Sequence, residues 1–433
     1  MVTTGVLGGQ WRASVSAWGA VEPWDGSDVL DWYVAADDRW HAPHQETSIR
    51  QTRVDGTPVV ETRLRIPNGD AVHRVWSVAD AGGMTLVEVA NESPMPIAVA
   101  FTRSDVRSIR PPATVPIEGI DLPFGSIVFP IGHQATVMVA IAHDGSGVGT
   151  LPSVAPLVQV ARAWSAMCDR ASRFVVPDEG AVAAVVTARC ELALCGPPDH
   201  ADDPIGFLLA VDQLVRMGEP AAPWAIDIAV AVERVARDAL PDWALDDALD
   251  AAARVLTAAG EQRGVRDLIA LRSRVSAHMV ARPDAVPAGV ARVGVWFERK
   301  FAERSGALLP AGLPSAWLGA AIEVYGAPVG PTAAVSYALR WHGERPAVLW
   351  ERTGAEVTLT APIVAPQWST THATGEALWP MPPGADTSVV VVGEAVAPEN
   401  TSPNDTSPDD TGPDDTGPNG PSLTIDGDGI SFG

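Results

Sequence analysis

The sequence predicts a multidomain α+β protein, because the pattern of apolar residues changes twice along the chain. Short runs rich in β-branched residues occupy the first third, segments with helical spacing follow, and strand-like runs then return. The length of 433 residues exceeds what one ordinary core accommodates, which also favours several domains. We predict five segments: an antiparallel β-sandwich over 1–152, an α-helical hairpin domain over 153–285, a small β domain over 286–396, a disordered acidic linker over 397–421 and a short apolar peptide over 422–433.

Six runs in the first region have the composition of β-strands, and turns containing Pro, Gly or Asp separate them. Val60, Leu64 and Ile66 alternate with charged residues, which is typical of a strand with one buried face. The runs follow one another at roughly ten-residue spacing, and this pattern predicts an antiparallel sandwich. They cover 57–66, 71–78, 84–90, 96–103, 126–131 and 135–143.

The second region has helical periodicity and helix-capping residues. Leu157, Ala161 and Trp164 fall on one helical stripe, which indicates a helix with one apolar face. Asp178 and Asp203 have the character of N-caps, and a glycine follows the end of each helix that they begin. Five or six helices fit before Pro283, and their short connections predict antiparallel hairpins.

Strand-like runs return from about Val293 and predict a second, smaller β unit. These runs cover 322–326, 335–341, 347–352 and 356–364. From Ala397 a five-residue repeat with proline in register is acidic and lacks apolar residues, so it cannot bury enough surface to fold. We therefore expect an extended linker, after which 422–433 places apolar residues around a turn.

The charge of the chain restricts its partners. Its formal net charge is −23, and Lys300 is the only lysine among its 30 basic residues. Such a surface repels nucleic acid and anionic membranes, so we expect neither as a partner. No stretch reaches the roughly 18 to 20 apolar residues of a membrane span. Because the first residues also lack a basic leader, we expect a cytoplasmic protein.

The cysteines are consistent with that compartment. Cys168, Cys190 and Cys195 lie in the predicted helical region, where we expect them to be small apolar residues of the core. An odd number of cysteines without paired spacing is typical of a reducing environment.

The sequence singles out no catalytic residue and no cofactor. Glycoside hydrolysis requires a pair of carboxylates, but the 53 acidic residues make many pairs plausible. Phosphate-binding glycine loops and the GxSxG nucleophile motif are absent, so we expect no cofactor. The short spacing between His41 and His44 lacks a second matched pair of ligands, so we expect no metal.

The strongest candidate site is an aromatic and acidic cluster near the N-terminus. Aromatic faces beside fixed carboxylates hold polar rings, above all sugars, because the ring packs on C–H groups while the carboxylates accept from hydroxyls. The alternative is that the tryptophans fill the space between two sheets and the acids cap turns. The candidate ligand-binding residues are Trp24, Asp25, Asp28, Asp31, Trp32, Trp40 and His41.

A second candidate lies at the end of a predicted hairpin in the C-terminal β unit. Trp341, His342 and Arg345 surround the turn HGERP between two strand-like runs. They either line a polar groove or brace the hairpin.

The order of these segments, together with DGSDVLDWYVAADDRWH (25–41) and ALRWHGERPAVLWE (338–351), resembles the six-hairpin glycosidase superfamily and its actinobacterial relatives of unassigned activity. In that superfamily the catalytic acids lie on loops of a toroid of twelve helices. Residues 153–285 have room for about half of these at a typical helix of roughly 11 to 12 residues. The resemblance therefore implies a shortened α/α toroid, and it transfers no catalytic residue to this chain.

We expect a carbohydrate-associated protein in which recognition is favoured over hydrolysis. If the protein is an enzyme, the resemblance implies a glycoside hydrolase-like activity. The alternative is a non-catalytic interaction or scaffold protein, whose acidic tether presents the peptide 422–433 to a protein partner.

Overall fold

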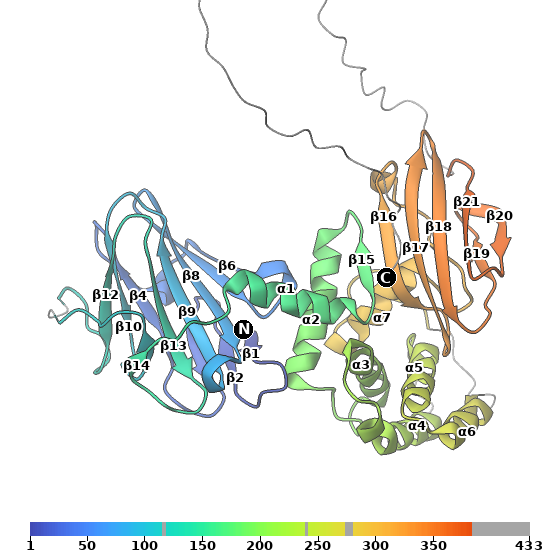
Figure 1. Ribbon diagram of the computed structural model, residues 1–433, viewed down its shortest axis with the longest axis horizontal. Helices are drawn as coiled ribbons and strands as arrows, with labels where there is room; N and C mark the ends of the chain where they lie inside the picture. Colours follow the sequence, from blue (N-terminus) through green and yellow to red (C-terminus); the bar gives the residue numbers. More distant parts are fainter. Residues whose placement is uncertain (115–117, 239–240, 273–279, 383–433) are drawn as a thin grey trace, which may run out of the picture. The chain divides into compact units, whose positions relative to one another are not determined.

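A computed structural model describes residues 1–114, 118–238, 241–272 and 280–382 of the chain (Figure 1). These residues contain seven α-helices and several sheets in which the strands are mostly antiparallel, so the expected α+β class is confirmed. Met1–Ala385 form one compact unit. The predicted linker over 397–421 and the apolar peptide over 422–433 lie outside the described residues and stay predictions.

The N-terminal region forms three sheets. Its strands are β1 (Val2–Gly5), β2 (Arg12–Val15), β3 (Val21–Pro23), β4 (Trp32–Ala35), β5 (Trp40–His41), β6 (Ile49–Arg53), β7 (Val60–Ile66), β8 (Gly69–Val78), β9 (Met84–Asn91), β10 (Ile97–Phe101), β11 (Arg107–Ser108), β12 (Ile127–Ile131), β13 (Thr136–Ala142) and β14 (Gly149–Thr150). Short 3-10 helices connect some of them: η1 (Pro43–Gln45), η2 (Val54–Gly56) and η3 (Asp80–Gly82). The sheet orders are β1-β2-β3, β12-β10-β4-β5 and β14-β11-β13-β9-β8-β7-β6. Among these pairings only that of β11 with β14 is parallel.

The four-stranded and seven-stranded sheets share one hydrophobic core. Val34 and Phe101 contribute to it from the first sheet, and Leu64 and Val87 from the second. Burial alternates along β7, as the sequence predicts, because successive side chains of a strand point to opposite faces. Strand β5 is an edge of the four-stranded sheet.

Seven α-helices lie in the described residues: α1 (Leu157–Asp169), α2 (Glu179–Cys195), α3 (Pro204–Met217), α4 (Ala225–Asp238), α5 (Leu245–Ala258), α6 (Gln262–Arg272) and α7 (Val290–Phe301). The two predicted N-caps are confirmed. Asp178 Oδ1 accepts from Ala181 N at 3.0 Å, and Asp203 Oδ1 accepts from Gly206 N at 2.9 Å. None of these helices combines the length and the apolar character needed to cross a bilayer.

The cysteines occupy two environments. Cys168 and Cys190 are buried between helices, with their Sγ atoms 3.6 Å apart. Cys195 is exposed, so the expectation that all three cysteines lie in the core is wrong for this residue. It is the last residue of α2, where the helix reaches solvent.

Helix α2 joins the N-terminal sheets to the helical region. Arg12 Nε donates to the Leu194 carbonyl oxygen at 2.7 Å, and Thr187 Oγ1 donates to the Gly56 carbonyl oxygen at 2.9 Å. A Cβ atom at position 56 would lie 2.5 Å from the Ala183 carbonyl oxygen. Glycine at this position therefore permits the close approach of η2 to α2.

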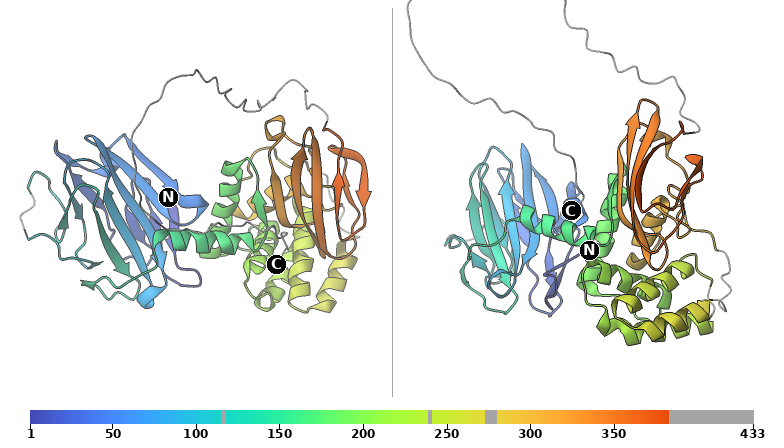
Figure 2. Two further views of the ribbon diagram at one scale, coloured as in Figure 1. Left: turned by 45° about the horizontal axis from the view of Figure 1, so that its top comes forward. Right: turned by 45° about the vertical axis from the view of Figure 1, so that its right-hand side comes forward.

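The C-terminal region forms a five-stranded and a two-stranded sheet (Figure 2). The strands are β15 (Arg173–Val175), β16 (Ile322–Pro328), β17 (Ala333–His342), β18 (Arg345–Gly354), β19 (Leu359–Ala361), β20 (Ala365–Thr370) and β21 (Thr374–Leu378). Two further 3-10 helices occur: η4 (Ala222–Trp224) precedes α4, and η5 (Ser315–Trp317) precedes β16. The larger sheet has the order β15-β16-β17-β18-β21. Its edge strand β15 therefore comes from the segment for which the sequence predicts helices alone.

Helix α7 lies in the region for which the sequence predicts strands, so that part of the prediction is wrong. Val293, Phe297 and Phe301 recur every four residues, and all three belong to the core cluster that also contains residues of the five-stranded sheet. This helix packs one face against the sheet and ends beside the largest pocket described below.

Candidate functional site

The aromatic and acidic residues of the predicted cluster do not lie on one surface. Trp32 is fully buried and stacks on His73, with the ring centroids 4.6 Å apart. Its Nε1 donates to the Trp18 carbonyl oxygen at 2.8 Å. The prediction that Trp32 stacks on a sugar is wrong, because its indole fills the core between the two sheets.

Trp24 and Asp25 lie on an exposed turn after β3. The Trp24 side chain is 54% exposed, and its Nε1 donates to Ser14 Oγ at 2.9 Å. Asp25 accepts from Trp11 Nε1 at 3.0 Å and from Ser27 N at 2.9 Å. The hydrogen bonds from Ser27 lower the pKa of Asp25, so this carboxylate stabilises the turn.

Asp28 and Asp31 are also engaged locally. The Asp28 carbonyl oxygen accepts from Arg103 Nη1 at 2.5 Å, while its side chain is exposed. Asp31 is half-buried, its Oδ1 accepts from Trp32 N at 2.9 Å, and burial raises its pKa. The Asp31 carboxylate thus accepts from a backbone N–H group, as in the alternative that we considered, whereas the Asp28 carboxylate is exposed.

Trp40 and His41, the remaining residues of the predicted cluster, form strand β5, and Trp40 borders a pocket. His41 is buried between two carboxylates: its Nδ1 lies 3.1 Å from Glu46 Oε1, and its Nε2 lies 3.0 Å from Asp38 Oδ1. Arg39 Nη1 donates to the same Glu46 oxygen at 2.7 Å. These contacts fix the loop that carries η1 against the edge strand.

The Trp40 pocket has a volume of about 440 Å³ and combines rings with polar groups. Trp40 Nε1 donates to the Glu118 carbonyl oxygen at 2.8 Å, which holds the indole at the wall. Tyr33 and His44 meet edge to face, with centroids 6.0 Å apart. The side chains that line the pocket beside these rings belong to Arg39, Gln45, Glu46, Ile120 and Asp121.

The charges of the Trp40 pocket favour hydrogen bonding to a neutral polar ligand. The hydrogen bond from Arg39 lowers the pKa of Glu46, so its carboxylate stays ionised and accepts hydrogen bonds at neutral pH. Arg39 itself is exposed and offers further N–H donors. Rings, an acceptor and donors therefore converge on one space, as they do in sites for polar cyclic ligands.

The second predicted group braces a hairpin. Trp341 Nε1 donates to the Ala320 carbonyl oxygen at 2.8 Å, and Arg345 Nε donates to the Trp379 carbonyl oxygen at 3.1 Å. His342 pairs with Arg345 at the turn between β17 and β18 and is exposed. The polar groups of Trp341 and Arg345 thus serve backbone carbonyls, which agrees with bracing and not with a groove.

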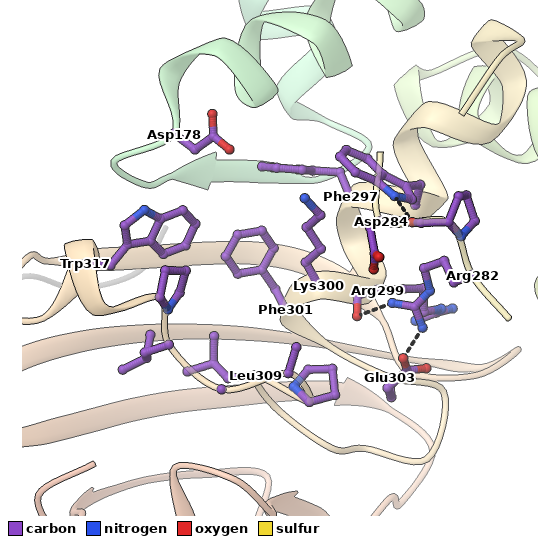
Figure 3. Close-up of a pocket in the computed structure, with 17 residues that line it drawn as sticks. Asp178, Arg282, Asp284, Phe297, Arg299, Lys300, Phe301, Glu303, Leu309 and Trp317 are labelled. Atoms are coloured by element: carbon purple, nitrogen blue, oxygen red, sulfur yellow. Dashed lines mark hydrogen bonds and ion pairs between the residues drawn. The ribbon is translucent and has the colours of Figure 1, made fainter. Parts of the chain in front are cut away.

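The largest pocket described lies elsewhere, between α7 and the segment that precedes η5 (Figure 3). This Lys300 pocket has a volume of about 570 Å³. Its walls include Trp296, Phe301 and Trp317, and the rings of Phe301 and Trp317 are parallel within 11° at a centroid distance of 6.1 Å. Lys300 is the cation that the sequence analysis noted as the only lysine but did not place in a site.

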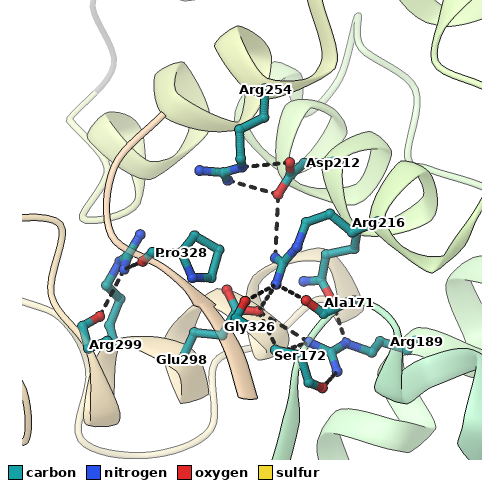
Figure 4. A network of polar contacts seen from close by, with 12 residues as sticks. Ala171, Ser172, Arg189, Asp212, Arg216, Arg254, Glu298, Arg299, Gly326 and Pro328 are labelled. Atoms are coloured by element: carbon teal, nitrogen blue, oxygen red, sulfur yellow. Dashed lines mark hydrogen bonds and ion pairs between the residues drawn. The ribbon is translucent and has the colours of Figure 1, made fainter. Parts of the chain in front are cut away.

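A buried ionic network lies on the other face of α7 (Figure 4). Glu298 Oε1 accepts from Arg216 Nη2 at 2.8 Å, from Arg189 Nη2 at 3.2 Å and from Ser172 Oγ at 2.8 Å. Burial alone would raise the pKa of Glu298, but the charges of Arg216 and Arg189 lower it to about 2. This carboxylate is saturated by its partners, so it stabilises the fold and is not placed to transfer protons.

The network continues from α3 to α5. Asp212 accepts from Arg254 Nε and Nη2, both at 2.8 Å, and Arg254 Nη1 donates to the Gly330 carbonyl oxygen at 2.9 Å. Asp212 Oδ2 also lies 3.6 Å from Arg216 Nη1. Helices α3, α5 and α7 are thereby tied to the C-terminal sheet by paired charges.

The comparisons with known proteins assign no family. No protein-family model matches the chain, and no curated protein matches it significantly. Across the described parts of the chain, no group of three or more His, Cys, Asp or Glu side chains is arranged to hold a metal ion.

Sequence reasoning missed two parts of these pockets. Glu46 and Arg39 lie near the predicted cluster in the sequence but were not predicted as site residues, because the contacts of Glu46 with Arg39 and His41 become visible only in three dimensions. The Lys300 pocket combines segments far apart in the chain, from Asp178 to Trp317. The single available signal was the lone lysine next to aromatic residues in WFERKF.

Proposed function

We propose that the protein recognises a carbohydrate, which binds in the Trp40 pocket. The observation that carries this proposal is the convergence of Trp40, Tyr33 and His44 with the ionised Glu46 around a space of about 440 Å³. That volume lies within the range of roughly 300 to 1,000 Å³ that is usual for small-molecule sites. The space suits one or two sugar rings.

Each group has a role in this proposal. The Trp40 indole offers an apolar face to the C–H side of a sugar ring, and Tyr33 and His44 bound the same space. Glu46 and Asp121 accept from sugar hydroxyls, while Arg39 and Gln45 donate to sugar oxygens. Trp40 remains in its role from the predicted cluster, and His41 acts indirectly by holding Glu46.

Recognition is favoured over hydrolysis by the electrostatics of the pocket. A glycosidase needs one carboxyl group with a raised pKa that stays protonated at neutral pH and donates to the leaving oxygen. Arg39 lowers the pKa of Glu46, which makes this group a good acceptor and a poor proton donor. The proposal is therefore a binding function without bond cleavage.

The proposal includes a finer description of the fold. The four-stranded and seven-stranded sheets form a β-sandwich with the Trp40 pocket at the β5 edge, and α1 to α6 correspond to a shortened toroid of helical hairpins. The resemblance to six-hairpin glycosidases supports a carbohydrate as the ligand. A cytoplasmic location remains part of this proposal.

Saturation-transfer NMR with a broad panel of neutral and acidic oligosaccharides tests the proposal. We expect saturation transfer from the intact protein to at least one sugar. A labelled form of that sugar should be displaced by the same unlabelled sugar and by no other member of the panel. The same panel with urea-unfolded protein controls for non-specific contact. Absence of transfer to every member of the panel would falsify the proposed function.

A further inference from the structure

Lys300 has a side-chain group that no other residue of the chain has. It is the only lysine among 30 basic residues, so its side chain carries the only ε-amine of the protein. Arginine cannot lose its proton under physiological conditions, whereas an amine can become a nucleophile. In Figure 3 the Lys300 side chain extends alongside the Phe301 ring, with its amine on the side of the pocket where Asp178 lies.

The amine lies against aromatic surface, and no carboxylate of the described residues forms an ion pair with it. Lys300 Nζ is 3.8 Å from the centroid of the Trp296 ring and 6.0 Å from that of Phe297. No ion pair or hydrogen bond joins Nζ to another group in the part of the chain that the structure describes. The amine is therefore free to contact a ligand that enters the pocket.

The neighbouring cations differ from Lys300 in this respect. Arg282 Nη2 donates to Glu303 Oε1, and Arg282 Nη1 donates to the Arg299 carbonyl oxygen at 2.8 Å. Arg299 Nε donates to Asp247 Oδ1 at 2.7 Å. Protein groups thus engage both arginines. Among the described residues, Lys300 is the one cation of the pocket that forms no hydrogen bond or ion pair with the protein.

The charged groups around the amine come from every element that packs against it. Asp178 precedes α2, Arg282 and Asp284 precede α7, and Glu303 follows α7. Burial lowers the pKa of Lys300, Asp178 and Asp284 oppose this effect, and Arg282 adds to it. On balance the pKa of Lys300 is lowered, so a larger fraction of the amine is neutral, which is its nucleophilic form.

We propose that the Lys300 pocket is a second ligand site, which takes an aromatic aldehyde or ketone and holds it as an imine on Lys300 Nζ. The flat walls formed by Trp296, Phe301 and Trp317 suit a planar ring, and the volume of about 570 Å³ accommodates one. This site is separate from the Trp40 pocket and does not depend on the proposed carbohydrate function.

The covalent step balances without an oxidant or a reductant. The lone pair of Nζ attacks the carbonyl carbon, and the carbonyl oxygen takes up a proton to give a carbinolamine. The oxygen then leaves as water with the two protons of the amine, and a carbon–nitrogen double bond remains. Amine and carbonyl compound thus give imine and water, and hydrolysis reverses the step.

Reductive trapping on the full chain tests the proposal. The probe is benzaldehyde with sodium cyanoborohydride at pH 7.5, and peptide mapping locates the benzyl group on Lys300 or on the α-amine of Met1. We expect Lys300 to react at least about tenfold faster than the ε-amine of Nα-acetyl-lysine amide, with a rate that rises with pH around a midpoint below the usual lysine pKa. Benzyl alcohol, which lacks the carbonyl group, should slow the reaction by occupying the same walls.

Two variants separate a ligand site from a structural cation. Lys300→Arg keeps the positive charge over Trp296 and should abolish the fast adduct without lowering the melting temperature. Trp317→Ala removes one wall and should slow the labelling of Lys300 at least about fivefold. Labelling of Lys300 no faster than the model amine would overturn the proposal, as would a fast reaction that neither benzyl alcohol nor Trp317→Ala slows.

Discussion

His41 Nδ1 lies 3.1 Å from Glu46 Oε1, and this contact ties the edge strand β5 to the residue that follows η1. Because the His41 ring is buried, it holds the carboxylate from the protein side while the opposite side faces the Trp40 pocket. Arg39 contacts the same oxygen and keeps the group ionised. The carboxylate is therefore positioned before a ligand arrives, which reduces the ordering cost of binding.

Glu46→Gln tests this arrangement. The change keeps the size of the side chain but removes its charge, so the contacts from Arg39 and to sugar hydroxyls weaken. We expect the affinity for the carbohydrate found in the panel to fall about tenfold or more, measured by isothermal titration calorimetry. Asp37→Asn, at an exposed acid of the preceding turn that does not line the pocket, should leave the affinity unchanged. Equal affinities for Glu46→Gln and the unmodified protein would show that Glu46 does not contact the ligand.

Glu298→Gln tests the structural role of the buried network. Without the carboxylate charge, Arg189 and Arg216 face each other inside the protein with less compensation, so we expect a loss of about 3 kcal/mol in the free energy of unfolding. Urea denaturation followed by circular dichroism measures this loss. The control is Glu233→Gln, which breaks an exposed pair with Arg237 at 2.5 Å and should cost no more than about 0.5 kcal/mol. A loss for Glu298→Gln as small as that of the control would contradict this role.

His73 makes the stability depend on pH. Its ring is fully buried, neither ring nitrogen has a hydrogen-bond partner in the described structure, and burial lowers its pKa from 6.5 to about 3. Between these two values the unfolded chain binds a proton that the folded protein excludes, so stability falls as the pH decreases from 6.5 towards 3. The slope for this one group approaches about 1.4 kcal/mol per pH unit.

His73→Phe should reduce the slope of the stability profile between pH 6.5 and pH 5. Burial also lowers the pKa of His143, to about 4, so this second histidine retains part of the slope. The phenyl ring preserves the stack on Trp32 and cannot take up a proton. Urea denaturation at several pH values gives the profile. His342→Leu changes an exposed histidine and should retain the slope of the unmodified protein. If His73→Phe also retains that slope, the acid sensitivity arises from another group.

The helix caps and the strand alternation could be predicted because local chemistry determines them. Asp178 and Asp203 satisfy backbone N–H groups three residues ahead, and the side-chain pattern of Val60, Thr62 and Leu64 depends only on strand geometry. Neither feature needs information about the rest of the chain.

The roles of individual tryptophans could not be predicted, because they depend on sheet pairing. Trp32 lies on the buried face of β4, whereas Trp40 of β5 pairs with Ala35 and therefore lies on the opposite face, with Tyr33, where it reaches the pocket. The helical spacing of Val293, Phe297 and Phe301 was available in the sequence, but the expectation of a β unit concealed it. The contacts of Glu298 with Ser172 and Arg189 join segments more than a hundred residues apart, and so does the lining of the Lys300 pocket, from Asp178 to Trp317. No local pattern of the sequence indicates either.

The affinity of Trp40→Ala for the carbohydrate, compared with that of Trp24→Ala, tests the central claim most directly. Trp24 is a matched control, because it is also a tryptophan of the predicted cluster, is 54% exposed and does not line the Trp40 pocket. We predict that Trp40→Ala lowers the affinity at least about tenfold in isothermal titration calorimetry, whereas Trp24→Ala leaves it unchanged. Unchanged binding in Trp40→Ala, or an equal loss in both variants, would contradict carbohydrate recognition at the Trp40 pocket.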